Sequence, residues 1–381
     1  MTSQKPGLSR RELIAAASAV GTAGAVVGAD RALAGARRTL AQAASVRAAG
    51  SDLGAVEHVI FLMQENRSYD HYFGTYPKGR GFDDHPAHRL GVFAQGYPGG
   101  KKMDPAKVLL PFRLRRPRDE CTKDLDHNWG VMHHCWNGGK MDRWVRVHTG
   151  SEGEGNPTGA LTMGYYTRKE LPFYYSLADH FTLGDGYFCS ILGQTHPNRL
   201  MQMSGTIDPA GKHGGPVTDT NVSPDAKWTA LWTSAPEVLE DKGVSWKVYQ
   251  PSNADLASMG ADAGRYAQLT SYPIWDPSNY DPNSPGVMFT SDNVLLYFKA
   301  FEDDTTTLHQ KAFSPTFPAE FSNDVKAGTL PAVSWIIPPL SFDEHASASP
   351  DHGMWFVQAV LNELTQNKEV WSKTVLFLMY D

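Results

Sequence analysis

The sequence is poor in cysteine and has no excess of positive charge. Its 381 residues include only 3 cysteines, and they form no CxxC pair or Cys/His spacing of a zinc site. Acidic residues outnumber basic ones, which gives a formal net charge of −6. Beyond about Ala29, no apolar run is long enough to cross a membrane as a helix. These absences exclude a zinc module, a nucleic-acid-binding protein and a protein with several membrane spans.

What the chain does contain is enough apolar material for a large core. Hydrophobic residues make up 41% and aromatic residues 11% of the chain, and the length fits one large or two ordinary domains. Strand-like apolar runs occur at residues 56–63, near 181–183, and at 244–249, 332–337 and 374–379. Helical patterns lie between several of them, at 168–178 and 353–365. This alternation predicts an α/β fold with a mainly parallel central sheet flanked by helices.

Two segments of this chain, residues 74–159 and 208–318, are rich in Gly, Pro, Asn and Asp. Their weak periodicity predicts long loop insertions over the sheet, where residues that shape a substrate site are often found.

The N-terminus has the pattern of an export signal. Arg10 and Arg11 precede a weakly apolar stretch of Ala, Gly and Val, and small-residue cleavage sites end at Ala34 and Ala43. A twin arginine before such a stretch is typical of a twin-arginine (Tat) leader. We therefore expect residues 1–50 to be leader and linker, and residues 51–381 to form the folded domain. The protein would be handed to the Tat export machinery and be secreted, periplasmic or associated with the cell wall.

The cysteines leave two possibilities open. In an oxidising compartment Cys121 and Cys135 could form a disulfide, and two free thiols fit the spacing equally well. Cys189 lies in an apolar run and is expected to be a small buried residue.

Residues 58–75, HVIFLMQENRSYDHYFGT, are the most informative stretch. A short apolar run ends abruptly at Glu65 and Asn66, whose side chains carry oxygen atoms suited to a hard cation. Ligands of parallel sheets bind beyond the carboxyl ends of the strands, which is where these two residues would lie. From spacing alone, a strand end followed by helix-capping residues is an equally simple interpretation.

A second stretch, SILGQTHPNR at residues 190–199, places a hydroxyl where an anion could bind. Thr195 precedes Pro197, a residue suited to the first turn of a helix. Free N–H groups at a helix N-terminus attract phosphate. Without further information, Thr195 could instead be a plain N-cap.

Together these stretches resemble the bacterial phosphoesterase family that contains the non-haemolytic, mycobacterial-type phospholipases C and the AcpA-like acid phosphatases, a family similar to alkaline phosphatases in fold. The resemblance covers nearly everything after about residue 55, in the family's order. Its first two motifs are residues 58–75 and residues 162–200, which contain the second stretch above. GVSWKVYQ (243–250), VSWIIPP (333–339) with Glu344-His345 downstream, and the terminal VLFLMYD follow. The phospholipase C branch fits better than the phosphatase branch.

The resemblance implies a phosphoryl-transfer site with one divalent metal ion of unknown identity. Thr195 matches the family's nucleophile, which forms a phospho-enzyme intermediate that water then hydrolyses. The metal ligands implied are Glu65, Asn66, Thr195 and Asp381. Asp381 is the first residue of an acidic pair whose second member would be residue 382. We therefore expect the C-terminal part of the fold to be missing from this sequence.

Histidines complete the implied site. His127 and His345 match positions that hold phosphate oxygens or protonate the leaving group, and His196 is a weaker candidate. Asp70 and His71 could support the metal site from outside, whereas His133 and His134 are expected to be structural.

The substrate implied is a phospholipid such as phosphatidylcholine, reached by peripheral contact with a membrane or cell envelope. Aromatic residues in the loops could form a wall for its quaternary ammonium group or simply pack in the loop cores; packing is the favoured interpretation. They are Tyr69, Tyr72, Trp129, Trp136 and Trp144. Two alternatives remain: an acid phosphatase of the same superfamily, and an inactive envelope protein that only binds lipid headgroups.

Overall fold

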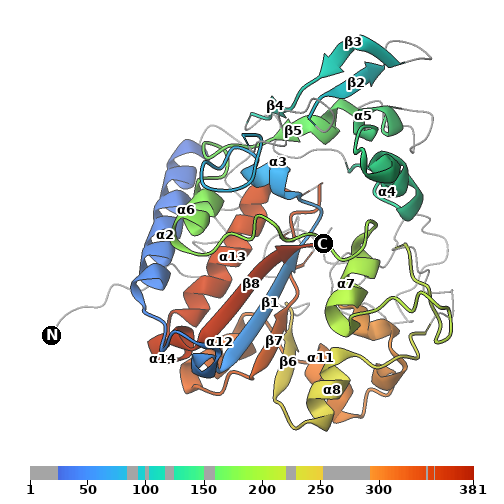
Figure 1. Ribbon diagram of the computed structural model, residues 1–381. Coiled ribbons are helices and arrows are strands. Elements are labelled where there is room, and N and C mark those ends of the chain that lie inside the picture. The colour runs from blue at the N-terminus through green and yellow to red at the C-terminus, as the bar shows by residue number, and fades with distance from the viewer. Residues whose placement is uncertain are drawn as a thin grey trace.

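The computed structural model describes residues 25–83, 93–98, 103–115, 124–149, 159–219, 229–251, 292–339, 342–346 and 348–381. Its centre is a four-stranded sheet in the order β6-β7-β1-β8 (Figure 1). The strands are β1 (His58–Gln64), β6 (Trp246–Tyr249), β7 (Val333–Ile336) and β8 (Thr374–Tyr380), and every neighbouring pair is parallel. The predicted α/β fold with a parallel central sheet is confirmed.

Successive side chains of the strands point to opposite faces of the sheet and pack into two hydrophobic cores, one on each face. Ile60 and Leu62 of β1 are fully buried in the first core, under the helices α2 (Ala25–Ser45), α6 (Pro172–His180) and α13 (Pro350–Leu364). Phe61, between them in sequence, packs against the second core, which includes α7 (Thr195–Ser204) and α11 (Thr307–Phe313). A strand that buries both faces needs the continuous apolar run seen in the sequence.

Smaller elements surround this frame. In Figure 1 a hairpin and two helices lie beyond the carboxyl ends of the central strands, at the top of the view. The remaining named elements of the structure are η2 (Leu53–Ala55), α3 (Tyr69–Phe73), β2 (Gln95–Pro98), β3 (Met103–Leu109), β4 (Phe112–Arg113), α4 (Trp129–Trp136), η4 (Asn137–Gly139), α5 (Trp144–Val147), η5 (Gly159–Met163), β5 (Gly164–Tyr165), α8 (Ala235–Asp241), η8 (Val294–Tyr297), η9 (Lys299–Phe301), α12 (Ala319–Ala327) and α14 (Lys368–Ser372).

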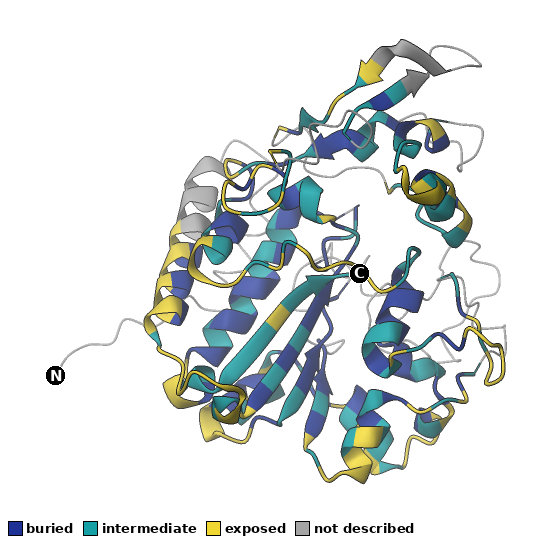
Figure 2. Ribbon diagram, in the orientation of Figure 1, coloured by how far each residue is buried: buried dark blue, intermediate teal, exposed yellow. Residues whose placement is uncertain are grey.

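Both predicted helices are present with shifted ends: α6 starts at Pro172 rather than 168, and α13 starts at Pro350 rather than 353. The strand expected near residues 181–183 is wrong. Phe181 caps the end of α6 and is 39% exposed, and no strand partner pairs with it among the described residues. Cys189, expected to be buried, is exposed. Figure 2 shows most of the segment that joins α6 to α7 as exposed ribbon.

The helix α2 was not expected, because the sequence predicted only leader and linker up to residue 50. Ala36, Leu40 and Ala43 are buried on its inner face, and Ala36 and Leu40 join the first core. The Thr39 hydroxyl donates a 2.5 Å hydrogen bond to Asn362 Oδ1 on α13. The second half of α2 is thus packed as part of the folded domain.

The strand β8 lies at the edge of the sheet, and its outward face is only partly covered. Phe377 is 46% exposed there, although it stacks on Phe61 at 5.5 Å between ring centroids. Within the described ranges, no helix combines the length and the apolar character that crossing a bilayer requires.

Candidate active site

The site begins where β1 and β8 end side by side. The two strands are parallel and in register up to the pair Gln64 and Tyr380, so the residues that follow, Glu65 and Asp381, leave the sheet together. Asn66 then adopts a left-handed backbone conformation with φ of 53°, which asparagine tolerates better than most residues. Its N–H donates a 3.0 Å hydrogen bond to Asp381 Oδ1. Strand pairing therefore brings together residues that are 315 positions apart.

Thr195 reaches the same place from α7. Gln194, not Thr195, is in the N-cap position of this helix. The Asn198 amide donates to the carbonyls of Ile191, Gly193 and Gln194 and so fixes the loop before the helix. The freed Thr195 hydroxyl donates a 3.0 Å hydrogen bond to Glu65 Oε2, and both residues are buried. The plain N-cap interpretation of Thr195 does not describe this geometry.

Sequence reasoning did not identify Arg199, which lies one helical turn after Thr195. Its Nη2 and Nε donate to Glu65 Oε1 at 2.7 and 3.2 Å. The same guanidinium lies 3.5 Å from Asp292 Oδ2 and 3.5 Å from Asp381 Oδ2. Arg199 follows the candidate nucleophile Thr195 by four residues, so on a helix both side chains lie on the same face. That spacing was the signal in the sequence that could have identified Arg199.

Two further acids were also missed. Asp292 and Asp343 each bring a carboxylate oxygen into a group with Glu65 in which all three atoms lie within 4.8 Å of one another. Glu65 N–H donates to the Asp343 carbonyl at 2.7 Å, which ties the two segments together. Asp343 could have been noticed as the residue before Glu344-His345. No pattern marked Asp292.

This acidic group fits a cation. Asp343 Oδ2 is buried and accepts no hydrogen bond from the described residues, and the buried Asp381 Oδ2 accepts none from them beyond its 3.5 Å ion-pair contact with Arg199 Nε. Leaving a carboxylate oxygen buried without a donor is costly, and a divalent cation is the usual solution. Carboxylate, amide and hydroxyl oxygens are also the donors that hard cations prefer. The buried triad could thus hold a metal ion.

The pKa values reflect the same crowding of charge. Burial alone would raise the pKa of Glu65, but Arg199, His345 and hydrogen bonds outweigh it and hold that pKa at about 2. Burial raises the pKa of Asp292 to about 7, against the pull of Arg199. Burial and then the charge of Glu65 raise the pKa of Asp343 and of Asp381 well above the usual range. One guanidinium does not neutralise four buried acids.

Two of the predicted histidines lie at this site. The Asn66 Nδ2 atom is 3.4 Å from His127 Nε2, and His127 Nδ1 donates to the Leu125 carbonyl at 2.6 Å. His345 Nε2 lies 3.5 Å from Asp124 Oδ2, and His127 Nδ1 lies 3.9 Å from the other oxygen of Asp124. Asp124, which the sequence did not suggest, therefore links both imidazoles.

The other histidines are placed further back. His196 is buried with its ring 5.2 Å from that of Tyr297. His133 bonds the Trp129 carbonyl within α4, as expected of a structural residue, and His134 is exposed.

His71, predicted to support the metal site, is connected to the site residues through Arg67. Its Nδ1 donates to the Gly164 carbonyl, and its Nε2 accepts from Arg67, which in turn donates to the Glu344 carbonyl. Asp70 lies beside it on α3, and burial raises the Asp70 pKa.

The loop aromatics form no common wall. Tyr72 is buried in the first core and donates a hydrogen bond to Glu344. Trp144, at the start of α5, packs against a small apolar cluster formed by α4 and α5. Trp136 is 45% exposed. Trp129 is the one near the nucleophile, because a Cβ on Gly193 would lie 3.7 Å from its ring. For Tyr72 and Trp144, the packing interpretation is the right one.

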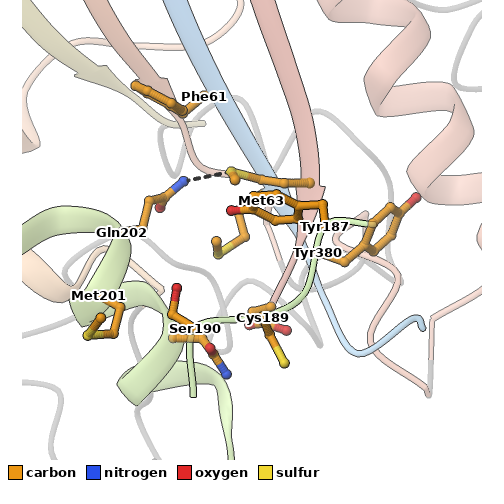
Figure 3. A pocket seen from close by; sticks show the side chains of 11 residues that line it. Phe61, Met63, Tyr187, Cys189, Ser190, Met201, Gln202 and Tyr380 are labelled. Atoms are coloured by element: carbon orange, nitrogen blue, oxygen red, sulfur yellow. Dashed lines mark hydrogen bonds between the residues drawn. The ribbon is translucent and has the colours of Figure 1, made fainter. Parts of the chain in front are cut away.

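Beside Asp381, between β8 and α7, lies an open pocket (Figure 3). Met63, Met201 and Tyr187 give it an apolar wall, and Gln202 donates to Met379 Sδ at 3.3 Å across it. Ser190, Asn198 and Asp381 line the same pocket, so its surface combines apolar and polar groups.

Two sequence predictions lie outside the described residues. Arg10 and Arg11 belong to residues 1–24, and Cys121 belongs to residues 116–123, so the leader and the Cys121–Cys135 pairing stay predictions.

The parallel sheet with a hydroxyl, an amide and clustered acids at its carboxyl edge defines a phosphoesterase-type site. Residues 56–381 match the phosphoesterase family, and the chain belongs to it.

Three relatives give the scale of the likeness. The chain is 40% identical over 392 residues to phospholipase C B of Mycobacterium tuberculosis, an alignment that covers all of this chain and 68% of the relative. It is 38% identical to phospholipase C A of the same organism, covering 86% of this chain and 58% of the relative. It is 37% identical to a non-hemolytic phospholipase C of Burkholderia pseudomallei, of which it covers 43%. The chain thus spans about two thirds or less of these relatives.

Proposed function

We propose that this protein is a phospholipase C that hydrolyses the phosphodiester of glycerophospholipids such as phosphatidylcholine. The observation that carries the proposal is the 3.0 Å hydrogen bond from the Thr195 hydroxyl to Glu65 at the carboxyl edge of the sheet. Relatives named phospholipase C in two bacterial genera support the substrate class.

In this reaction the Thr195 hydroxyl gives its proton to water, and Oγ1 attacks phosphorus. The P–O bond to diacylglycerol breaks, diacylglycerol leaves, and a phospho-threonine that still carries the headgroup remains. Glu65 is anionic at neutral pH, so it orients the hydroxyl through its hydrogen bond but is a weak base. The N-terminal turn of α7 directs its free N–H groups toward the negative charge that develops on the phosphate oxygens. Water then attacks the phospho-threonine and releases the headgroup phosphate.

One divalent ion is part of the proposal, with Glu65, Asn66, Thr195 and Asp381 as the residues that would hold it. When bound, such an ion lowers the pKa of a neighbouring hydroxyl and neutralises phosphate charge. The buried Asp343 Oδ2, which accepts no hydrogen bond from the described residues, supports a cation here. Asp292 and Asp343 lie close enough to contribute to the same site.

The leaving alkoxide needs a proton. His127 and His345 are the proposed donors, because both lie at the edge of the acidic group and both face Asp124. A carboxylate beside an imidazole orients the ring.

Replacing Thr195 by Ala tests the proposal. We expect the variant to lose at least about three orders of magnitude in turnover of p-nitrophenylphosphorylcholine, since no nucleophile remains. Thr195→Ser keeps the hydroxyl and should retain activity. Chelation should silence the wild type and leave the folded state intact by circular dichroism.

Several outcomes would contradict this reading. Faster hydrolysis of p-nitrophenyl phosphate than of the choline ester would favour an acid phosphatase. A wild type and a Thr195→Ala variant that are equally inactive, yet bind phosphatidylcholine vesicles equally well, would favour a headgroup-binding protein.

We also propose that the protein is exported by the Tat machinery and works outside the cytoplasm, in contact with lipid. Arg10-Arg11 and the weakly apolar stretch after them support export. Export of a folded chain suits an enzyme whose buried acids take up their ion before leaving the cell.

A further inference from the structure

The guanidinium of Arg199 has a place at the candidate site that the reaction above does not use. Its side chain is 1% exposed, and it lies on the same face of α7 as Thr195, one turn further along. Both residues bond Glu65, but to different oxygens: Arg199 takes Oε1 and Thr195 takes Oε2. The two contacts together fix the rotation of the Glu65 carboxylate.

The same guanidinium joins two other chain segments. Nη2 lies 3.5 Å from Asp292 Oδ2, and Nε lies 3.5 Å from Asp381 Oδ2. Asp381 is held on its other oxygen by the Asn66 N–H. Because the guanidinium is planar and has donors on several edges, it can serve three carboxylates at once, which a lysine ammonium at one point cannot.

We infer that Arg199 is a positioning residue that holds Glu65 and Asp381 in the orientation in which they bind the divalent ion. Asp292, 3.5 Å from Nη2, helps to fix the guanidinium. The inference rests on the metal site of the proposed function and deepens it. Arg199 itself touches neither the ion nor the substrate in this scheme.

The physical reason is the charge balance of the buried group. Without Arg199, the Glu65 and Asp381 carboxylates lose the guanidinium that contacts both of them, and their mutual repulsion turns them apart. Fewer anionic oxygens would then point at the ion. Residues that orient metal ligands typically contribute about 10- to 100-fold to metal affinity.

An alternative role for Arg199 predicts the opposite change in metal affinity. If Arg199 competed with the ion for the same carboxylates, removing it would tighten metal binding. Metal affinity, measured directly, therefore tests the inference independently of turnover.

The experiment uses the 381-residue chain after chelator treatment, titrated by calorimetry with Mn²⁺, Ca²⁺ and Zn²⁺ in turn. For the ion that binds the wild type best, Arg199→Gln should raise the Kd about 10- to 100-fold. Arg199→Lys keeps the charge but not the planar guanidinium, so its Kd should lie between those of the wild type and Arg199→Gln. Asp292→Asn should raise the Kd by less than Arg199→Gln does. Arg113→Gln is the matched control. Arg113 lies on β4, outside the site, and its replacement breaks an ion pair with Glu170. This variant should leave the Kd unchanged.

An unchanged or lower Kd in Arg199→Gln overturns the inference. If that variant does not fold by circular dichroism, the comparison of Arg199→Lys with Arg113→Gln decides in the same way. A wild type that binds the ion tightly but does not cleave p-nitrophenylphosphorylcholine contradicts the proposed function and leaves the inference standing. A wild type that binds none of the three ions overturns the metal site and the inference together.

Discussion

At the scale of single residues, the neighbourhood of His345 depends on a buried carboxyl group. Glu344 is fully buried with a left-handed φ of 74°, a strained conformation for a residue with a side chain. Its carboxyl accepts hydrogen bonds from Tyr72, Tyr174 and Gln64. Burial raises the pKa of Glu344 to about 7, although these hydrogen bonds oppose the shift. The strained residue thus sets the direction in which the chain continues to His345.

Gly353 on α13 makes room for this carboxyl group. A Cβ at that position would overlap the Cγ, Cδ and Oε1 atoms of Glu344. We expect Gly353→Ala to lower the free energy of unfolding by about 1–3 kcal/mol, as overpacking does in other cores, and to lower turnover by displacing His345.

Urea unfolding and the choline-ester assay would measure both effects. Gly130→Ala is the matched control: it also lies in a helix, but its nearest contact would be an ordinary 3.5 Å to Asn128. It should be neutral or slightly stabilising, by up to about 1 kcal/mol. If Gly353→Ala behaved like this control, Glu344 would be free to move and could not be what directs His345.

At the scale of elements, the pairing of β1 with β8 creates the site, and α2 supports the sheet from behind. From Ala34 onward, where burial is described, the buried residues of α2 are small side chains and one leucine, Leu40, which is 2% exposed. Its periodicity is hard to see in an Ala/Gly-rich sequence, because exposed positions such as Ala34 and Ala41 are also small and apolar. That is why a linker was expected.

The packing of α2 predicts the effect of shortening its one large side chain. Leu40→Ala should lower the free energy of unfolding by about 2–5 kcal/mol, the usual cost of a cavity in a core. Arg38→Ala, on the exposed face of the same helix, should change it by no more than about 0.5 kcal/mol. Denaturant titration of the two variants beside the wild type measures this. Equal stability of all three would mean that α2 is not docked in solution.

At the scale of the whole molecule, export and folding have to be compatible. Cleavage of a leader after Ala43 would remove Ala36 and Leu40 from the first core, whereas cleavage after Ala34 would leave them in place. We therefore expect the exported protein to begin near residue 35.

The twin arginine gives the test. Replacing Arg10-Arg11 by Lys-Lys should retain the protein in the cytoplasm of a Tat-competent bacterium, since that motif is the expected export address. The same change at Arg37-Arg38, an exposed pair on α2, is the control and should not affect export. Cell fractionation and N-terminal sequencing are the measurements. Normal export of the first variant would refute a Tat leader.

Sequence patterns predicted much of this frame but not all of the site. The apolar runs placed all four central strands, and the motifs placed Glu65, Asn66, Thr195, His127 and His345 around one point. Asp292, Asp343 and Asp124 were not foreseen, since their local sequences resemble any polar loop. Arg199 was in view but without a role, because its partners lie 134 positions away at Glu65 and further still at Asp381.

The sequence by itself determined the four central strands and the polar residues at their carboxyl ends, because apolar runs and abrupt polar boundaries are local properties of the chain. It also determined the kinds of donor atoms available at those ends. Only the tertiary structure decided that three acids contact one arginine and that a buried glutamate directs the chain to His345. Those relations arise from strand order and helix packing, which join residues with no pattern linking them along the chain.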